Sequence, residues 1–179
     1  MWRHLRAQTR ERAAQFCWFL GTGARLGEAQ RAHEDHVHAT EIHIPGTKTA
    51  KAASTIPITE VTKPWIVRAL KDAPRTADGL LFAHWHNVYR DLRKACAAVN
   101  APRVSPNDLR RTMITWHYER GTPPHLLAEL ARHASTEMVQ RVYAQKSSRA
   151  TGEILAKYVP LATVKPPSRA RARGRKKSA

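Results

Sequence analysis

The stretch SPNDLRRT, residues 105–112, places two arginines where a helix should begin. Pro106 and Asn107 open the predicted helix, and Arg110 and Arg111 follow close behind them. The helix macrodipole puts partial positive charge at this end, so acidic side chains are the usual choice there. Two cations placed against that field indicate that an anion binds nearby.

The overall charge indicates what kind of anion this is. The chain has 31 Lys and Arg against 14 Asp and Glu, which gives a formal net charge of +17 and a pI near 10.9. This excess is far beyond what solubility requires, and it favours a polyanionic partner, with double-stranded DNA as the first expectation. A membrane partner is not expected, because the sequence shows no membrane-spanning run, no signal peptide and no basic amphipathic helix with an apolar face.

The length of 179 residues fits one domain with a tail, and 42% hydrophobic residues can supply its core. We expect the domain to occupy residues 1–160. Residues 161–179 should form a basic, disordered tail, because from Lys165 onward there are seven basic residues and no acid. Cys17 and Cys96 lie in apolar surroundings, and we interpret them as buried thiols of a protein from a reducing cytoplasm.

The hydrophobic pattern predicts a mainly α chain (class α+β) with one small antiparallel β-sheet. Alternating residues on both sides of a glycine-containing turn predict a β-hairpin over residues 40–58. Helical periodicity, glycines and prolines predict helices over residues 8–20, 24–32, 60–72, 86–99, 106–120, 124–132, 136–146 and 150–158.

Two short motifs could have indicated other chemistry. The histidine-rich run HEDHVH (33–38) has no second ligand cluster, and an alternating strand would direct its side chains to opposite faces. We therefore favour exposed or locally hydrogen-bonded histidines over a metal site, which stays an alternative. The turn GTGAR (21–25) is not followed by the rest of a P-loop. The charge remains compatible with a reaction on phosphate that uses neither metal nor nucleotide cofactor.

Five segments together resemble the conserved boxes of the tyrosine recombinases, the phage-integrase family. The first is close to the family pattern T-G-x-R-x-x-E, the third to H-x-L-R-(H/R)-T and the fourth to L-G-H-(S/T)-(S/T). The segments are GTGARLGEAQ (21–30), GTKTAKAASTIPI (46–58), SPNDLRRT (105–112), LARHAST (130–136) and MVQRVYAQ (138–145). Their order and spacing match the family, and the resemblance covers about residues 15–145.

The resemblance implies a role for each candidate site residue. Arg25 and Arg110 would bind the scissile DNA phosphate, and Lys48 would protonate the departing 5′-oxygen. Tyr143 would attack the phosphorus and form a 3′-phosphotyrosine, while His133 would hydrogen-bond the phosphate. No metal or other cofactor is implied. Glu28 is expected to orient Arg25, and Asn107 completes the set of candidate catalytic residues.

The sequence also departs from the family pattern. Asn107 stands where the family most often has histidine, and its amide can donate to a phosphate oxygen but cannot accept a proton, so we expect slowed cleavage. The usual glycine before His133 is missing. Only a short lead precedes the first box, so the N-terminal DNA-clamping domain of the family is expected to be absent. The chain could be an excised domain, a truncated product or a minimal stand-alone form.

Several residues keep alternative interpretations. Lys51 competes with Lys48 as the general acid, and Arg25 could serve only in an ion pair with Glu28. Asn107 could be a plain helix N-cap. Arg110 could be a solvated helix charge and His133 an ordinary helix-end histidine. The other tyrosines that compete with Tyr143 as the nucleophile are Tyr89, Tyr118 and Tyr158.

We therefore predict a site-specific DNA recombinase or integrase that serves a mobile element. The resemblance implies a homotetramer on two paired DNA sites, with residues 148–160 docking on a neighbouring subunit. The expected location is the cytoplasm or nucleoid of a prokaryotic cell. The alternative is a non-catalytic DNA-binding protein derived from the same fold. Basic residues on 60–95 and on the tail are expected to follow the DNA backbone.

Overall fold

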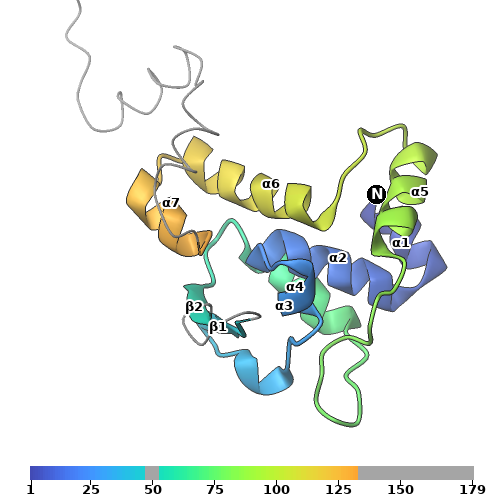
Figure 1. Ribbon diagram of the computed structural model, residues 1–179, viewed down its shortest axis with the longest axis horizontal. Coiled ribbons are helices and arrows are strands. Elements are labelled where there is room, and N and C mark those ends of the chain that lie inside the picture. The colour runs from blue at the N-terminus through green and yellow to red at the C-terminus, as the bar shows by residue number, and fades with distance from the viewer. Residues whose placement is uncertain (47–52, 133–179) are drawn as a thin grey trace, which may run out of the picture. The chain divides into compact units, whose positions relative to one another are not determined.

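The computed structural model describes residues 1–46 and 53–132, which lie in the first of two compact units, Met1–Gln145. Helices dominate this part of the chain, and one two-stranded antiparallel sheet accompanies them (Figure 1), which confirms the predicted fold class. The elements are α1 (Trp2–Gln8), α2 (Arg10–Thr22), α3 (Leu26–Ala29), the 3₁₀ helix η1 (Glu34–His36), β1 (Glu41–Ile44), β2 (Ser54–Pro57), α4 (Lys63–Asp72), α5 (Val88–Ala98), α6 (Pro106–Glu119) and α7 (Pro124–Leu130).

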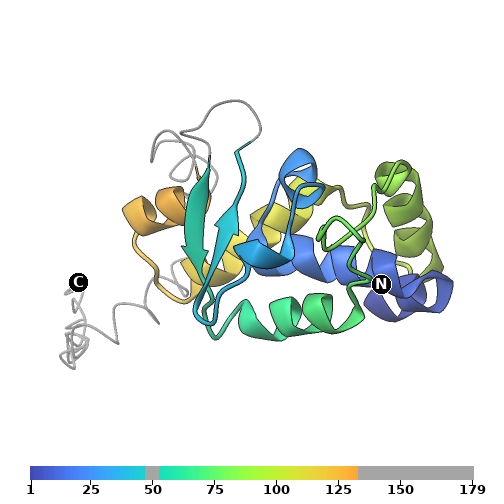
Figure 2. The same cartoon turned by 90° about the horizontal axis from the view of Figure 1, so that it is seen from below.

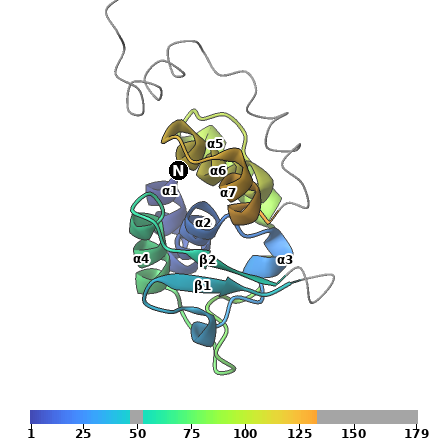
Figure 3. The ribbon, with the colours of Figure 1, turned by 90° about the vertical axis from the view of Figure 1, so that its left-hand side faces the viewer.

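Helix α2 is the central element of the described unit. Every residue from Ala13 to Thr22 is buried, because α2 packs against α1, α4 and α6. Figure 2 and Figure 3 show α2 lying between α4 and α6. A helix covered on several sides must be apolar around most of its circumference, as the segment AAQFCWFL is. The free thiol of Cys17 is buried in this helix, as predicted, and so is that of Cys96 in α5.

The β-hairpin adds a small sheet to the same core. Strands β1 and β2 pair antiparallel with Ile42 opposite Ile56, and these side chains are buried together with Ile44 in the main hydrophobic cluster. The alternation of the strands therefore places isoleucines on the core face and polar residues on the other. The hairpin predicted over residues 40–58 is confirmed for its strands. Lys48 and Lys51 lie outside the described residues.

Helix α6 begins with a reciprocal cap. The Ser105 hydroxyl accepts from the Asp108 backbone N–H at 3.3 Å, and the Asp108 carboxylate accepts from the Ser105 N–H at 3.0 Å. Pro106 occupies the first helical position, where a backbone N–H would have no acceptor within the helix, so its absence costs no hydrogen bond. The N-cap is thus Ser105, which corrects the interpretation of Asn107 as the cap. Asp108 supplies the acidic group that the macrodipole favours.

Helix α7 packs on α6 through a second, smaller cluster. Met113 and Ile114 of α6 meet Leu127 and Ala128 of α7 there, and Tyr118 is partly buried against them. This contact holds α7, and the residue that follows its C-terminus, beside the middle of α6. Tyr118, which the sequence left as a competitor of Tyr143, is therefore a packing aromatic of its helix.

Some sequence expectations were wrong or fall outside the described part. The run around His36 forms the 3₁₀ helix η1 instead of a strand, and α1 was not predicted. In the part of the chain that the structure describes, no helix is long and apolar enough to cross a membrane. The helices predicted over 136–146 and 150–158 and the tail 161–179 lie outside it.

Candidate phosphate-binding site

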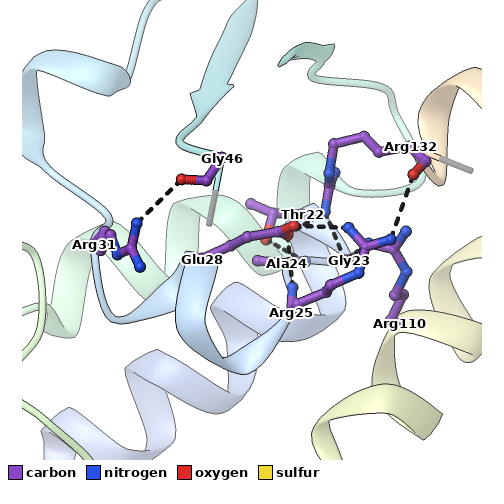
Figure 4. A network of polar contacts seen from close by, with 9 residues as sticks. All are labelled: Thr22, Gly23, Ala24, Arg25, Glu28, Arg31, Gly46, Arg110 and Arg132. Carbon is purple, nitrogen blue, oxygen red and sulfur yellow. Dashed lines mark hydrogen bonds and ion pairs between the residues drawn. The ribbon is translucent and has the colours of Figure 1, made fainter. Parts of the chain in front are cut away.

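Three arginines from separate elements converge beside the C-terminal end of α2 (Figure 4). Arg25 is the N-cap of α3, Arg110 lies on α6, and Arg132 comes after Ala131, the C-cap of α7. Their guanidinium groups share two acceptors, the carboxylate of Glu28 and the backbone carbonyl of Gly23. The residues that form this arginine cluster thus come from segments that are far apart in the sequence.

Gly23 provides the first acceptor because α2 ends there in a left-handed turn. Its φ is +58°, and its N–H donates to the Phe19 carbonyl at 2.9 Å, which closes the helix in the manner usual for glycine. A Cβ at this position would collide with the methyl group of Met113. Gly23, the second glycine of the segment GTGAR, is therefore required by backbone geometry and by the close approach of α6.

Arg110 extends from α6 to this end of α2. Its Nη1 donates to the Gly23 carbonyl at 2.7 Å, and Nη2 of Arg132 donates to the same oxygen at 3.0 Å. Cations are favoured at a helix C-terminus, so the dipole that stabilises Arg110 belongs to α2 and not to the start of α6. Arg111 is exposed and pairs with Asp108 at 3.5 Å. Of the two arginines in SPNDLRRT, only Arg110 joins the cluster.

Glu28 provides the second acceptor, and its side chain is only 1% exposed. Oε1 accepts from Nη1 of Arg25 at 2.7 Å, while Oε2 accepts from the Arg25 backbone N–H at 2.8 Å and from Nη2 of Arg132 at 2.7 Å. Burial alone would raise the pKa of Glu28, but the Arg132 charge and the hydrogen bonds from Arg25 together lower that pKa below its ordinary value. The carboxylate is therefore ionised at neutral pH.

The cluster carries more positive than negative charge. Burial, followed by repulsion from Arg132 and Arg25, lowers the pKa of Arg110 to about 9. This value still leaves Arg110 protonated at neutral pH. Its Nη2 is buried and has no hydrogen-bond partner among the described residues. A buried charged donor without an acceptor is unfavourable, and an anion that entered the cluster could supply the acceptor.

Arg25 is the accessible member of the cluster, because 45% of its side chain is exposed. The ion pair with Glu28, which the sequence left as an alternative, is present, but it occupies only part of the guanidinium. Among the described residues, Nη2 makes one long contact, at 3.4 Å, to the Arg132 carbonyl. An exposed and partly occupied guanidinium can bind two oxygens of an incoming phosphate.

The structure brings together only some of the predicted site residues. Arg25 and Arg110 lie in one cluster, and Asn107 is exposed on α6, three residues before Arg110 and so on the same side of the helix. The other three candidates, Lys48, His133 and Tyr143, lie outside the described residues. The sequence did not identify Arg132 as part of the site, although the missing glycine in LARHAST was the signal that could have found it.

The histidine-rich run around η1 brings several imidazole rings near one another. His36 lies near His33 and His43, with ring centroids 5.8 and 5.2 Å apart, so the side chains are closer together than a strand would place them. Burial and the neighbouring histidines lower the pKa of His36. Within residues 1–46 and 53–132, no group of three or more His, Cys, Asp or Glu side chains is arranged to hold a metal ion.

The helical fold and the arginine cluster define the class of the tyrosine-recombinase catalytic domain. The family model described as the phage integrase family matches residues 4–149, so this chain belongs to the phage integrase family. No curated protein matches the sequence.

Solved structures with the same fold include three recombinases. XerA recombinase superimposes with a TM-score of 0.68 at 19% identity, over 89% of this chain and 62% of its own. The catalytic domain of bacteriophage HP1 integrase gives 0.57 at 24% identity, over 83% of this chain and 82% of its own. XerH recombinase bound to its palindromic difH substrate gives 0.57 at 19% identity, over 83% of this chain and 46% of its own. This chain thus spans about three fifths of XerA.

Proposed function

We propose that this chain is the catalytic domain of a site-specific DNA recombinase that acts through a 3′-phosphotyrosine intermediate. The observation that supports this most directly is the meeting of Arg25 and Arg110 beside the buried carboxylate of Glu28, with a donor of Arg110 left without an acceptor. In a member of the phage integrase family, the anion that such a pair would bind is the scissile phosphate of DNA.

The proposed reaction exchanges one phosphoester bond for another. The Tyr143 oxygen attacks the phosphorus, the bond to the 5′-oxygen breaks, and the protein becomes linked to the 3′-phosphate. Arg25 and Arg110 hold the non-bridging oxygens and stabilise the charge that develops on them. Lys48, or Lys51 in the alternative, gives a proton to the departing 5′-oxygen. Attack by a 5′-hydroxyl of another strand reverses these steps and rejoins the DNA.

The remaining two candidates would assist by hydrogen bonding. His133 and Asn107 each have a donor for a phosphate oxygen. The Asn107 amide cannot accept the phenolic proton, which must pass to another base or to water. Cleavage is therefore expected to be slow compared with an enzyme that has histidine at this position.

Double-stranded DNA is the proposed partner, and the net charge of +17 supports it. The related XerH was solved bound to its difH substrate, and Tn1549 integrase in complex with circular intermediate DNA. We further propose a homotetramer on two paired sites, a catalytic unit ending near residue 160, a basic tail over 161–179 and a cytoplasmic location. No metal or cofactor takes part in the proposed steps.

A second candidate function is DNA binding without catalysis. The observation that favours it is Asn107, because a site that had lost strand cleavage would no longer need a proton acceptor there. Both candidates bind DNA, and they differ in whether Tyr143 becomes attached to it.

Covalent trapping distinguishes the two candidates. The purified chain is mixed with nicked duplexes made from the DNA that flanks its own gene, then denatured and separated on a gel. Recombinase activity predicts a slower protein–DNA band that disappears in Tyr143→Phe and persists in the matched controls Tyr118→Phe and Tyr158→Phe. Salt-sensitive binding without any band from the unaltered chain would favour the non-catalytic protein.

A further inference from the structure

Arg132 has a backbone conformation that its side chain does not favour. It follows Ala131, the C-cap of α7, and has a φ of +51°, and its N–H donates to the Glu129 carbonyl at 2.8 Å. Helices commonly end with glycine in this left-handed conformation, because the Cβ atom of an L-residue is sterically unfavourable there. Retention of a strained residue beside a charged site suggests that its side chain has a function.

The side chain of Arg132 is buried and only half used. It is 4% exposed, and Nη2 makes both of its hydrogen bonds, one to Glu28 and one to the Gly23 carbonyl. The other two nitrogens, Nε and Nη1, are buried and have no partner among the described residues. A guanidinium presents five N–H donors, and burying three of them without acceptors is costly.

These free donors lie beside the free donor of Arg110. Arg110 and Arg132 bind the same carbonyl oxygen of Gly23, so their guanidinium groups are neighbours, as Figure 4 shows. Burial and the Arg25 charge lower the pKa of Arg132, although Glu28 opposes this shift. The cluster has three guanidinium groups and one carboxylate. Two of its positive charges are therefore not compensated by Glu28.

We propose that Arg132 is a third anion-binding arginine, whose Nε and Nη1 donate to an oxygen of the same phosphate that Arg25 and Arg110 bind. This inference rests on the proposed function, because it takes the anion to be a phosphate of DNA. A phosphodiester carries one negative charge and gains a second as the attacking oxygen adds. A third cation fixed in advance next to those oxygens stabilises the additional charge.

Inorganic phosphate is a suitable probe, because its binding can be measured without DNA or catalysis. The thermal midpoint of the full chain is followed as phosphate is added at constant ionic strength. The test variant is Arg132→Gly, which removes the guanidinium and fits the left-handed backbone. Arg132→Lys, which keeps the charge but loses the planar fork, provides a second variant in case the glycine variant folds poorly.

Arg75→Gly is the matched control. Arg75 also has a positive φ, +52°, and also faces a glutamate, with its Nε 3.8 Å from Glu34, but it lies outside the arginine cluster. The same substitution therefore removes the same charge and the same backbone strain away from the site. We expect phosphate to stabilise the unaltered chain and Arg75→Gly equally. Arg132→Gly should bind phosphate about tenfold more weakly or worse, and Arg132→Lys should be intermediate.

Equal phosphate affinity in Arg132→Gly and the unaltered chain would overturn the inference, and so would an unaltered chain that phosphate does not stabilise. The trapping experiment with Tyr143→Phe is read separately. Phosphate binding that depends on Arg132, together with no covalent DNA adduct, would contradict the proposed recombinase activity and leave Arg132 as an anion-binding residue. A covalent DNA adduct, together with phosphate binding that does not change in Arg132→Gly, would support the recombinase activity and contradict the role proposed for Arg132.

Discussion

Glu28 compensates part of the charge of three guanidinium groups, and its removal would leave them to repel one another. Glu28→Gln has nearly the same volume but no charge, so it should lower the free energy of unfolding by about 3–5 kcal/mol, as loss of one partner from a buried ion pair does. Urea unfolding at neutral pH measures this. The control is Glu60→Gln, because Glu60 is exposed and pairs with Lys63 at 3.6 Å, and its loss should cost less than about 1 kcal/mol.

The difference in stability between the unaltered chain and Glu28→Gln should depend on pH. The pKa of Glu28 in the folded chain lies below its ordinary value of 4.5, so its ion pairs contribute fully above pH 4.5 and are lost as the pH falls through the folded-state value. The stability difference between the unaltered chain and Glu28→Gln should therefore narrow in acid. A difference that stays constant there would show that charge is not what Glu28 contributes.

At the scale of single residues, the sequence predicted part of the cluster that surrounds Gly23. Arg25, Glu28 and Arg110 were found because each sits in a segment with a family pattern. The missing glycine of LARHAST marked the position of Arg132, but its place in the cluster depends on a backbone angle and on two acceptors from other segments, which the sequence does not show. Arg111 lies outside the cluster that contains Arg110, since adjacent helical residues point in different directions, and an anion at Arg111 stays a prediction.

Among the elements, α2 packs against α1, α4 and α6, and its last turn contacts α4 closely at Gly21. A Cβ on Gly21 would come within 2.6 Å of the Ile66 Cγ1 atom and 3.1 Å of the Ile66 backbone nitrogen. Gly21→Ala should therefore lower the free energy of unfolding by about 1–3 kcal/mol through overpacking, although alanine alone favours a helix over glycine by about 1 kcal/mol. Chemical denaturation of the single variant measures the net effect.

A double-mutant cycle tests the cause of that effect. Ile66→Ala removes the side-chain atom that the new methyl group would strike, so Gly21→Ala should cost clearly less in that background. Equal costs in both backgrounds would mean that the backbone contact, or something outside this helix pair, is responsible.

The sequence predicted elements best where the local pattern and the tertiary surroundings agree. The buried isoleucines of the hairpin alternate, and the prolines of α6 and α7 mark their starts, so these elements were found. Helix α1 was missed because only Leu5 of it is buried, which leaves no periodic apolar face to recognise. The segment after Arg25 was predicted as a helix over 24–32, but only Leu26–Ala29 is helical. The Arg25–Glu28 contacts hold that short turn.

For the molecule as a whole, the excess of positive charge should contribute most to DNA binding where several arginines lie on one surface. A hollow of about 360 Å³ beside the start of α6 is lined by Arg90, Arg93 and Arg103, with one carboxylate, Asp108. Arg90 and Asp108 already have ionic partners, whereas the exposed Arg93 and Arg103 are the ones most suited to DNA phosphates. The N-terminal end of α6 adds partial positive charge at the same place.

This surface predicts a particular salt dependence of DNA binding. Each phosphate that the protein neutralises contributes about −0.9 to the slope of log K against log salt concentration. Arg93→Ala and Arg103→Ala should each weaken binding to any duplex sequence and make the slope shallower by about 0.9, with additive effects in the double variant. Fluorescence anisotropy at several salt concentrations measures both quantities, and Arg75→Gly serves again as the charge-matched control. A double variant with the slope of the unaltered chain would place the DNA backbone on another face. In that event, the arginine cluster at Gly23 would have to be reached without contacts beside α6.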